Sequence, residues 1–387
     1  MAATTRRTVG LILATVLVIG IVVAIIVGRG MQAGPGGPAA GGGDLTVVTG
    51  VIGSEKKPFF DDPRVREEFA RHGLDVRVTT AGSRQIATSV DLDGVDFVFP
   101  SSAPAADKAR EVTGAETVHA PFYSPMVVAS FEPIAELLEE AGVARRSDAG
   151  MWTLDMHAYL ELVADDTRWN QLEGADDAYP SSRSILISST DIRTSNSAAM
   201  YLAIASYVAN GDNIVSGARQ QDEVLDEMSA LFLKQGYSAD SSESPFEDYL
   251  SQGIGSKPLV MAYEAQFLGR QLNEATAAAI TDDMVLLYPA PTILSKHSLV
   301  SLTDAGDQVG RLLTDDDALA RLEAAYGFRP NDAAVFTSVL EESGVPVPPA
   351  PVDVVEPPAY ESLEGMIQEI AERYDTSAPT EHPTADQ

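Results

Sequence analysis

The stretch ILISSTDIRTSNSAAMYLAIASYVANG, residues Ile185 to Gly211, decides how the rest of the chain is interpreted. It begins with the apolar run 185–187, which is typical of a buried strand, and continues as a polar loop from Ser188 to Asn196. A helix rich in Ala, Leu and Tyr follows and is expected to end at Gly211, since glycine readily takes the left-handed conformation past a helix end. This order predicts a site for an anion or a polar ligand, because the first turn of a helix leaves N–H groups unpaired.

The polar loop ends in four residues with short donor and acceptor groups: Thr194, Ser195, Asn196 and Ser197. The simplest interpretation is that they cap the helix, because Ser, Thr and Asn are the preferred N-cap residues. Three more loops of the same design, each after a predicted strand, favour a ligand site instead. We therefore include all four residues in the candidate site.

The composition excludes several classes of protein. The chain has 387 residues with 26 Lys and Arg against 57 Asp and Glu, a formal charge of −31, which argues against nucleic acid as a partner. The absence of Cys excludes disulfides, thiolate metal sites, cysteine nucleophiles and a lipid-modified N-terminal cysteine. No metal or cofactor is expected. The five His lie far apart and are expected at the surface or at helix ends rather than on a metal: His72, His119, His157, His297 and His382.

The N-terminal segment predicts a membrane anchor. Residues 9–27 contain no charge, and as a helix they span about 28 Å, enough to cross the lipid bilayer. Because this run is longer than the apolar region of a secretory signal, we predict an uncleaved anchor, with cleavage near Ala39 as the alternative. Basic residues beside a membrane helix tend to stay in the cytoplasm, so Arg6 and Arg7 predict that residues 1–8 are cytoplasmic and that the body lies outside. Residues 28–43 are predicted to form a Gly/Pro-rich tether.

Strands and helices alternate after the tether. The runs 45–50, 74–79 and 95–99 read as strands, each followed by a polar loop and a helix, and this order predicts a parallel sheet with flanking helices. Ligands bind beyond the carboxyl ends of such strands, where these loops lie. The candidate ligand residues in the three loops are Ser54, Lys56, Gly82, Ser83, Arg84, Ser101 and Ser102.

Two crossing segments predict a division into two lobes. Residues 116–131 are expected to form two strands interrupted by PFYSP, and residues 259–263 form the return crossing. Tyr123 and Tyr263 lie on these crossings and are candidate ligand contacts, with hinge packing as the alternative. A salt bridge of Glu264 across the hinge is also expected. The predicted boundaries are 44–118 and 265–340 for lobe 1, 119–264 for lobe 2, and 341–387 for a Pro-rich linker, a short amphipathic helix and a disordered tail.

The order of these segments resembles the extracytoplasmic solute-binding proteins, in particular the type 2 branch that includes molybdate-, sulfate- and phosphate-like binders. The segments that carry the resemblance are 82–83, 96–102 and 195–197, within residues 44–330. The resemblance implies an α/β Venus-flytrap fold, with mostly parallel sheets and flanking helices, whose two lobes close over a ligand held by backbone N–H groups and hydroxyls. The chain departs from the family in having no cysteine for a lipid tether and in carrying a Pro-rich extension.

These observations predict a membrane-anchored binding protein that captures a small anionic or polar solute outside the membrane. An enzyme is not expected, because the chain has no GxSxG, HExxH or P-loop motif. The expected partners are the solute, a membrane permease or another envelope protein, and the bilayer through residues 9–27. The alternative is an envelope sensor or interaction module that reuses the fold. An accessible cleft lined by the four loops favours capture, and a cleft filled by side chains or by the tail favours docking.

Overall fold

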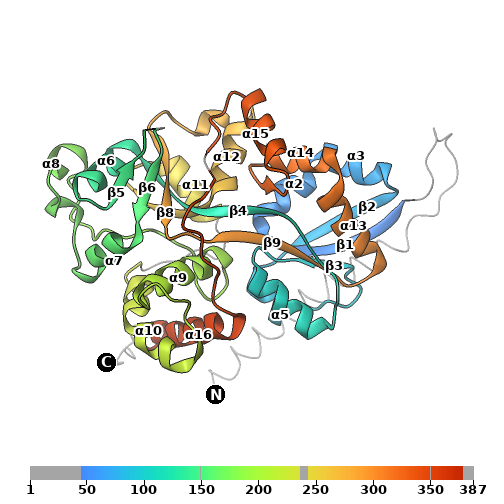
Figure 1. Cartoon of the computed structure of the whole chain (residues 1–387), viewed down its shortest axis with the longest axis horizontal. Coiled ribbons are helices and arrows are strands. Elements are labelled where there is room, and N and C mark those ends of the chain that lie inside the picture. Colours follow the sequence, from blue (N-terminus) through green and yellow to red (C-terminus); the bar gives the residue numbers. More distant parts are fainter. Residues whose placement is uncertain (1–44, 149, 236–242, 349, 378–387) are drawn as a thin grey trace, which may run out of the picture. The chain divides into compact units, whose positions relative to one another are not determined.

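The computed structural model describes residues 45–387 except 149, 236–242, 349 and 378–387 (Figure 1). The predicted anchor at 9–27, the tether at 28–43 and the end of the tail lie outside the described residues. Within the described part of the chain, no helix is both long and apolar enough to cross a membrane.

Lobe 1 contains the three predicted strand–loop–helix units (Figure 1). Its parallel strands are β2 (Leu74–Thr80), β1 (Thr46–Ile52) and β3 (Phe97–Phe99), in that order across the sheet. The segments that follow them are the 3-10 turn η1 (Ser54–Lys56), α2 (Lys57–Asp61), α3 (Pro63–Arg71), α4 (Ser83–Thr88) and α5 (Ala103–Thr113). Two apolar clusters cover this part of the sheet, one around Phe59, Phe97 and Phe99 and one around Ile86 and Val98.

A single long strand, β4 (Val118–Phe131), joins the two halves of the sheet. The prediction of two strands interrupted by PFYSP was wrong. The ladder between β4 and β9 (Leu294–Ser301) shifts its register between His119 and Phe122, which accommodates Pro121, and Pro125 pairs in register with Leu294 at the end of the ladder. The first part of β4 pairs with β9 and β10 (Arg329–Pro330), and the last part pairs with β7 (Val260–Tyr263) and β8 (Met284–Ala290).

Lobe 2 is built on the other half of the sheet. There β8 pairs in parallel with β6 (Trp152–Asp155), which pairs antiparallel with β5 (Ala144–Arg146). Strand β8 lies in the range 265–340, which the sequence assigns to lobe 1, but it pairs with β4 and β6. Strand β9 lies in the same range and pairs with β3, so the sheet of lobe 1 is built from two distant parts of the chain.

The apolar run 185–187 is not a strand. Its backbone donors go to irregular partners, since Ile185 N donates to Thr167 O and Ile187 N to the hydroxyl of Tyr159. Only a single bridge, between Ser188 and Val260, ties this segment to β7. The helix after it, α9 (Asn196–Ala209), is buried on almost every side and forms the centre of the lobe 2 core, with Gly211 at positive φ after its end.

The remaining helices surround these sheets (Figure 1). Those of lobe 2 are α6 (Glu132–Glu140), α7 (Met156–Ala164), η2 (Trp169–Gln171), α8 (Ala175–Ala178), α10 (Gly217–Leu233) and α11 (Glu243–Gln252). Those that follow β7 are α12 (Glu264–Leu272), η3 (Ala277–Ala279), α13 (Asp304–Asp315), α14 (Asp317–Ala325) and α15 (Ala333–Glu342).

The amphipathic C-terminal helix, α16 (Tyr360–Ser377), packs on the body of the protein. Figure 1 shows it beside α10, and its apolar residues Leu363, Met366, Ile367 and Ile370 are buried in the lobe 2 core. These residues follow the i, i+3, i+4, i+7 spacing that places side chains on one face of a helix. The contact therefore accounts for the apolar face that the sequence predicted.

Candidate ligand site between the two lobes

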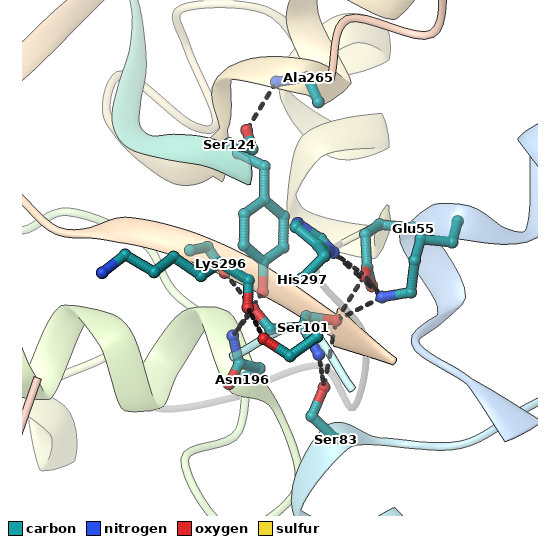
Figure 2. A network of polar contacts seen from close by, with 12 residues as sticks. Glu55, Ser83, Ser101, Ser124, Asn196, Ala265, Lys296 and His297 are labelled. Carbon is teal, nitrogen blue, oxygen red and sulfur yellow. Dashed lines mark hydrogen bonds and ion pairs between the residues drawn. The ribbon is translucent and has the colours of Figure 1, made fainter. Parts of the chain in front are cut away.

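Ser101 is the centre of a polar cluster at the carboxyl ends of β1, β2 and β3 (Figure 2). Its backbone N donates to Ser83 Oγ over 2.9 Å, and the Ser83 hydroxyl donates to Ser101 Oγ over 3.1 Å. The Ser101 hydroxyl donates in turn to the carboxylate of Glu55. Parallel strands end at the same edge of a sheet, so the loops after β1, β2 and β3 converge as the sequence predicts.

Lobe 2 contributes Asn196, the first residue of α9, to the same cluster. Its side-chain amide donates to Ser101 O over 3.3 Å and to the hydroxyl of Tyr263 over 3.0 Å. Close by, a Cβ atom on Gly82 would lie 2.5 Å from Thr194 O, so the absence of a side chain at this position lets the loops of the two lobes touch. The two sets of predicted loops therefore meet.

The charged part of the cluster surrounds Lys56, which is fully buried. Its ammonium lies 2.5 Å from Glu55 Oε1, 3.0 Å from Ser101 Oγ and 3.1 Å from His297 Nδ1. Because an ammonium can only donate, Nδ1 accepts, which places the imidazole proton on Nε2. That Nε2 is buried and has no hydrogen-bond partner among the described residues.

Burial and mutual charges shift the pKa values of all three ionisable groups of the cluster. Burial alone raises the pKa of Glu55, but the charge of Lys56 opposes this effect and holds the pKa well below its usual range. Burial lowers the pKa of Lys56, and the Glu55 charge opposes that effect. Burial, followed by the Lys56 charge, lowers the pKa of His297 to about 4, so its imidazole is neutral at pH 7.

Several predicted residues lie at the edges of this cluster. Ser195 and Ser197 are buried and bond to each other over 3.0 Å, and Ser102 is buried at the start of α5. Thr194 is half-buried, and Ser54 is exposed. Tyr123 pairs with Lys296 in the β4–β9 ladder, whereas Phe122 pairs with His297, so Tyr123 faces the opposite side of the sheet from the histidine. The ligand-binding roles of all these residues stay predictions.

Glu55, His297 and Ser295 are the residues that the sequence prediction missed. His297 was expected at the surface or at a helix end, which was wrong, because it is fully buried on β9. The alternation of side chains along this strand could have predicted the burial of His297. With a period of two, His297 lies on the same face as Ser295 and Leu299, which are both buried. Ser295 donates from that face to the carbonyl of Ser101.

The C-terminal helix covers one side of the cluster. Arg84 on α4 donates from Nε and Nη2 to Glu364 of α16 over 2.9 and 2.5 Å, and from Nη1 to Ile192 O over 2.8 Å. Only about 10 Å³ of cavity remains between α16 and the loops. On another side, Glu55 and Tyr263 border a cavity of about 120 Å³. Side chains thus fill most of the space beneath α16, as the docking alternative expects, whereas the cavity beside Glu55 is open, as capture expects.

The predicted salt bridge of Glu264 forms with Arg329, and its place across a hinge stays a prediction. Arg329 Nε lies 2.6 Å from Glu264 Oε2, its Nη2 lies 2.8 Å from Oε1, and the Tyr288 hydroxyl donates to Oε1 over 2.6 Å. Both charged side chains are buried. This pair links the start of α12, after β7, to β10.

One group of possible metal ligands lies elsewhere in lobe 1. Glu68, His72 and Asp316 each place a ligand atom within 4.8 Å of the others. Glu68 also pairs with Arg71 over 2.6 Å, and Asp316 caps α14, so contacts within the protein account for these side chains.

Comparisons with known proteins support the fold. No protein-family model matches the sequence, and no curated protein matches it. One similar solved structure is the sulfate-binding protein SubI from Mycobacterium tuberculosis H37Rv, which is 18% identical in sequence. The match covers 84% of this chain and 98% of that chain, with a TM-score of 0.51. A periplasmic thiamin binding protein (12% identity, 88% and 99% covered, TM-score 0.54) and a ferric binding protein from Campylobacter jejuni (9% identity, 86% and 99% covered, TM-score 0.55) are also similar. The chain has the type 2 binding-protein fold.

Proposed function

We propose that this chain, with its type 2 binding-protein fold, captures a small solute with an anionic group between its two lobes, outside the membrane to which residues 9–27 anchor it. The supporting observation is that the predicted loops already hold one carboxylate, that of Glu55, through Lys56 and Ser101. In this proposal the carboxylate or oxyanion of the solute takes the place of the Glu55 carboxylate.

The charge of Lys56 makes this exchange favourable. A buried cation needs a partner, because its desolvation is otherwise uncompensated. Glu55 fills that role in the solute-free protein, and a bound anion fills it when Glu55 turns away. The cavity of about 120 Å³ that Glu55 borders gives its side chain room to move.

The overall charge fits a site of this kind. A chain with a formal charge of −31 repels anions at long range, so a solute has to be held by short-range contacts. Lys56, the hydroxyls of Ser83 and Ser101, and the amide of Asn196 are such groups. Binding is expected to tighten modestly as ionic strength rises, provided that the anion of the added salt does not compete.

The test removes the internal carboxylate with Glu55→Gln. Calorimetry with phosphate, sulfate and succinate is expected to show binding to E55Q about tenfold tighter than to the wild type, the equivalent of one hydrogen bond to a charged group. Glu356→Gln is the matched control, because Glu356 is exposed and pairs with Lys296. A Lys56→Met variant is expected to lose the binding. Equal affinities in E55Q and the wild type would contradict the exchange.

A second candidate function is favoured by one observation, the packing of α16 over one side of the cluster. In this alternative the chain is an envelope sensor or interaction module that docks onto another protein. If neither the wild type nor E55Q binds any small anion, the docking function is the better explanation. The partner, a permease or another envelope protein, is then identified by cross-linking on intact cells.

The anchor has its own test. Fractionation of cells is expected to place the full-length chain in the membrane, and protease added to spheroplasts is expected to digest the body. A mature chain beginning near residue 40, or a body protected from protease, would refute the anchoring or the orientation.

A further inference from the structure

A second cavity, of about 300 Å³, lies in lobe 2 and shares no lining residue with the cluster around Ser101. It lies between the segment 183–189, the end of α10 and the turn 256–258, with Trp169 at its wall. This volume is at the lower end of the range of small-molecule sites. Three of its eleven lining residues are basic and none is acidic. Such a lining is unusual in a chain with 57 acidic and 26 basic residues.

The basic groups of this cavity are only partly neutralised. Lys234 pairs with Asp166 over 3.1 Å. Arg183 donates to the backbone carbonyls of Ser256 and Gly255 over 2.9 and 2.7 Å, so its charge faces neutral oxygens. Lys257 is half-buried, and no hydrogen bond or ion pair joins its ammonium to the described part of the chain. The cavity therefore has an excess of positive charge.

Unpartnered polar atoms lie at the same wall. Ser189 is 5% exposed, and its Oγ is buried without a hydrogen-bond partner among the described residues. The Nε2 of Gln235 is also buried without a partner there, while its Oε1 accepts from Ser189 N over 2.8 Å. Buried polar atoms are nearly always hydrogen-bonded. A hydroxyl and an amide donor that are unpartnered beside a lysine point to a ligand with acceptor oxygens.

We propose that this cavity is a second binding site, for a small molecule that carries an oxyanion group, a carboxylate, sulfate or phosphate. The ammonium of Lys257 neutralises the anion, and the side chains of Ser189 and Gln235 turn toward the cavity so that Oγ and Nε2, which are buried in this structure, donate hydrogen bonds to it. Arg183 holds the turn at 255–256 and so positions Lys257. Hydrogen bonds to a charged group are stronger than neutral ones, which suits a site with few donors.

The experiment uses the whole chain and two substitutions that break no side-chain hydrogen bond or ion pair between described residues, Ser189→Ala and Lys257→Gln. The probes are inorganic phosphate, sulfate and succinate, titrated by calorimetry to about 10 mM, which detects a Kd near 1 mM. Lys296→Gln is the control, because it removes one positive charge at an exposed pair elsewhere. Comparison of the affinity for succinate with the affinities for phosphate and sulfate shows whether the site prefers a carboxylate ligand or a free inorganic oxyanion.

At least one probe is expected to bind the wild type and Lys296→Gln with equal affinity. The same probe is expected to bind Ser189→Ala and Lys257→Gln about tenfold more weakly. The Tm of Ser189→Ala without a probe is expected to match or exceed that of the wild type, because the lost hydroxyl has no partner among the described residues. A probe held at the Ser101 cluster keeps its affinity in both variants, which separates the two sites. The proposal is overturned if no probe binds the wild type, or if both variants bind as tightly as the wild type.

Discussion

Two buried ion pairs among the described residues, Glu264–Arg329 and Glu55–Lys56, differ in how the charged groups are joined. In the Glu264–Arg329 pair, two bonds of 2.6 and 2.8 Å join the guanidinium to both carboxylate oxygens, and Tyr288 adds a third. In the Glu55–Lys56 pair the ammonium reaches only one carboxylate oxygen, over 2.5 Å, and its other contacts go to the neutral groups Ser101 Oγ and His297 Nδ1. A bidentate pair holds its geometry, whereas a pair joined through one carboxylate oxygen beside a cavity is easier to exchange. We infer that the first pair is structural and the second is available for ligand exchange.

The largest expected effect comes from the structural pair. Glu264→Gln leaves the buried guanidinium of Arg329 without a carboxylate, and it is expected to lower the free energy of unfolding by about 3–5 kcal/mol. The measurement is urea denaturation of the wild type, the variant and the exposed-pair control Glu356→Gln. A loss no larger than that of the control would remove the distinction between the two pairs.

The next effect concerns His297 and pH. Its pKa in the folded protein is about 4, against 6.5 when unperturbed, so between these values the unfolded chain binds the proton more readily. The fold therefore loses stability as pH falls from 6.5 to 4, on the order of 3 kcal/mol from this residue alone.

His297→Gln is expected to reduce that loss, since glutamine does not titrate. Urea denaturation at pH 7, 5 and 4 gives the free energy of unfolding as a function of pH for the variant and the wild type. The difference between the two slopes against pH cancels the contribution of the carboxylates, which both proteins share. Identical slopes would show that His297 is not buried in the neutral form.

The smallest effect is expected at the contact between α16 and lobe 1. Arg84 and Glu364 are partly exposed, and Arg84 also donates to Ile192 O, so Glu364→Gln is expected to cost about 1 kcal/mol or less. Thermal denaturation gives the difference, and Glu356→Gln again serves as the control. A loss as large as that of Glu264→Gln would mean that the contact of α16 stabilises the fold as strongly as the Glu264–Arg329 pair does.

Much of this architecture was predictable because short-range patterns decide it. The three strand–loop–helix units, α9 and the apolar face of α16 follow from the periods of apolar residues and from Gly73 and Gly211, which lie at positive φ after helices or turns. The convergence of the Ser83 and Ser101 loops follows from the parallel order of their strands.

Other elements were not predictable because their partners lie far away in sequence. Residues 185–187 have the composition of a strand, but their donors find Thr167 and Tyr159 instead of a neighbouring strand. The prolines at 121 and 125 suggest a break, but pairing with β9 carries β4 through both of them. Propensity is a local property, and long-range pairing overrides it.

The sequence by itself determined which groups stand at the strand ends, because the two-residue and 3.6-residue periods place Ser83, Ser101 and Asn196 after strands or at the start of helices. Only the tertiary structure decided what those groups bind. Glu55 reaches Ser101 across 46 positions, His297 reaches Lys56 across 241, and Glu364 reaches Arg84 across 280. Contacts at such separations depend on how whole elements pack, and the free energy of that packing is not encoded in any single segment.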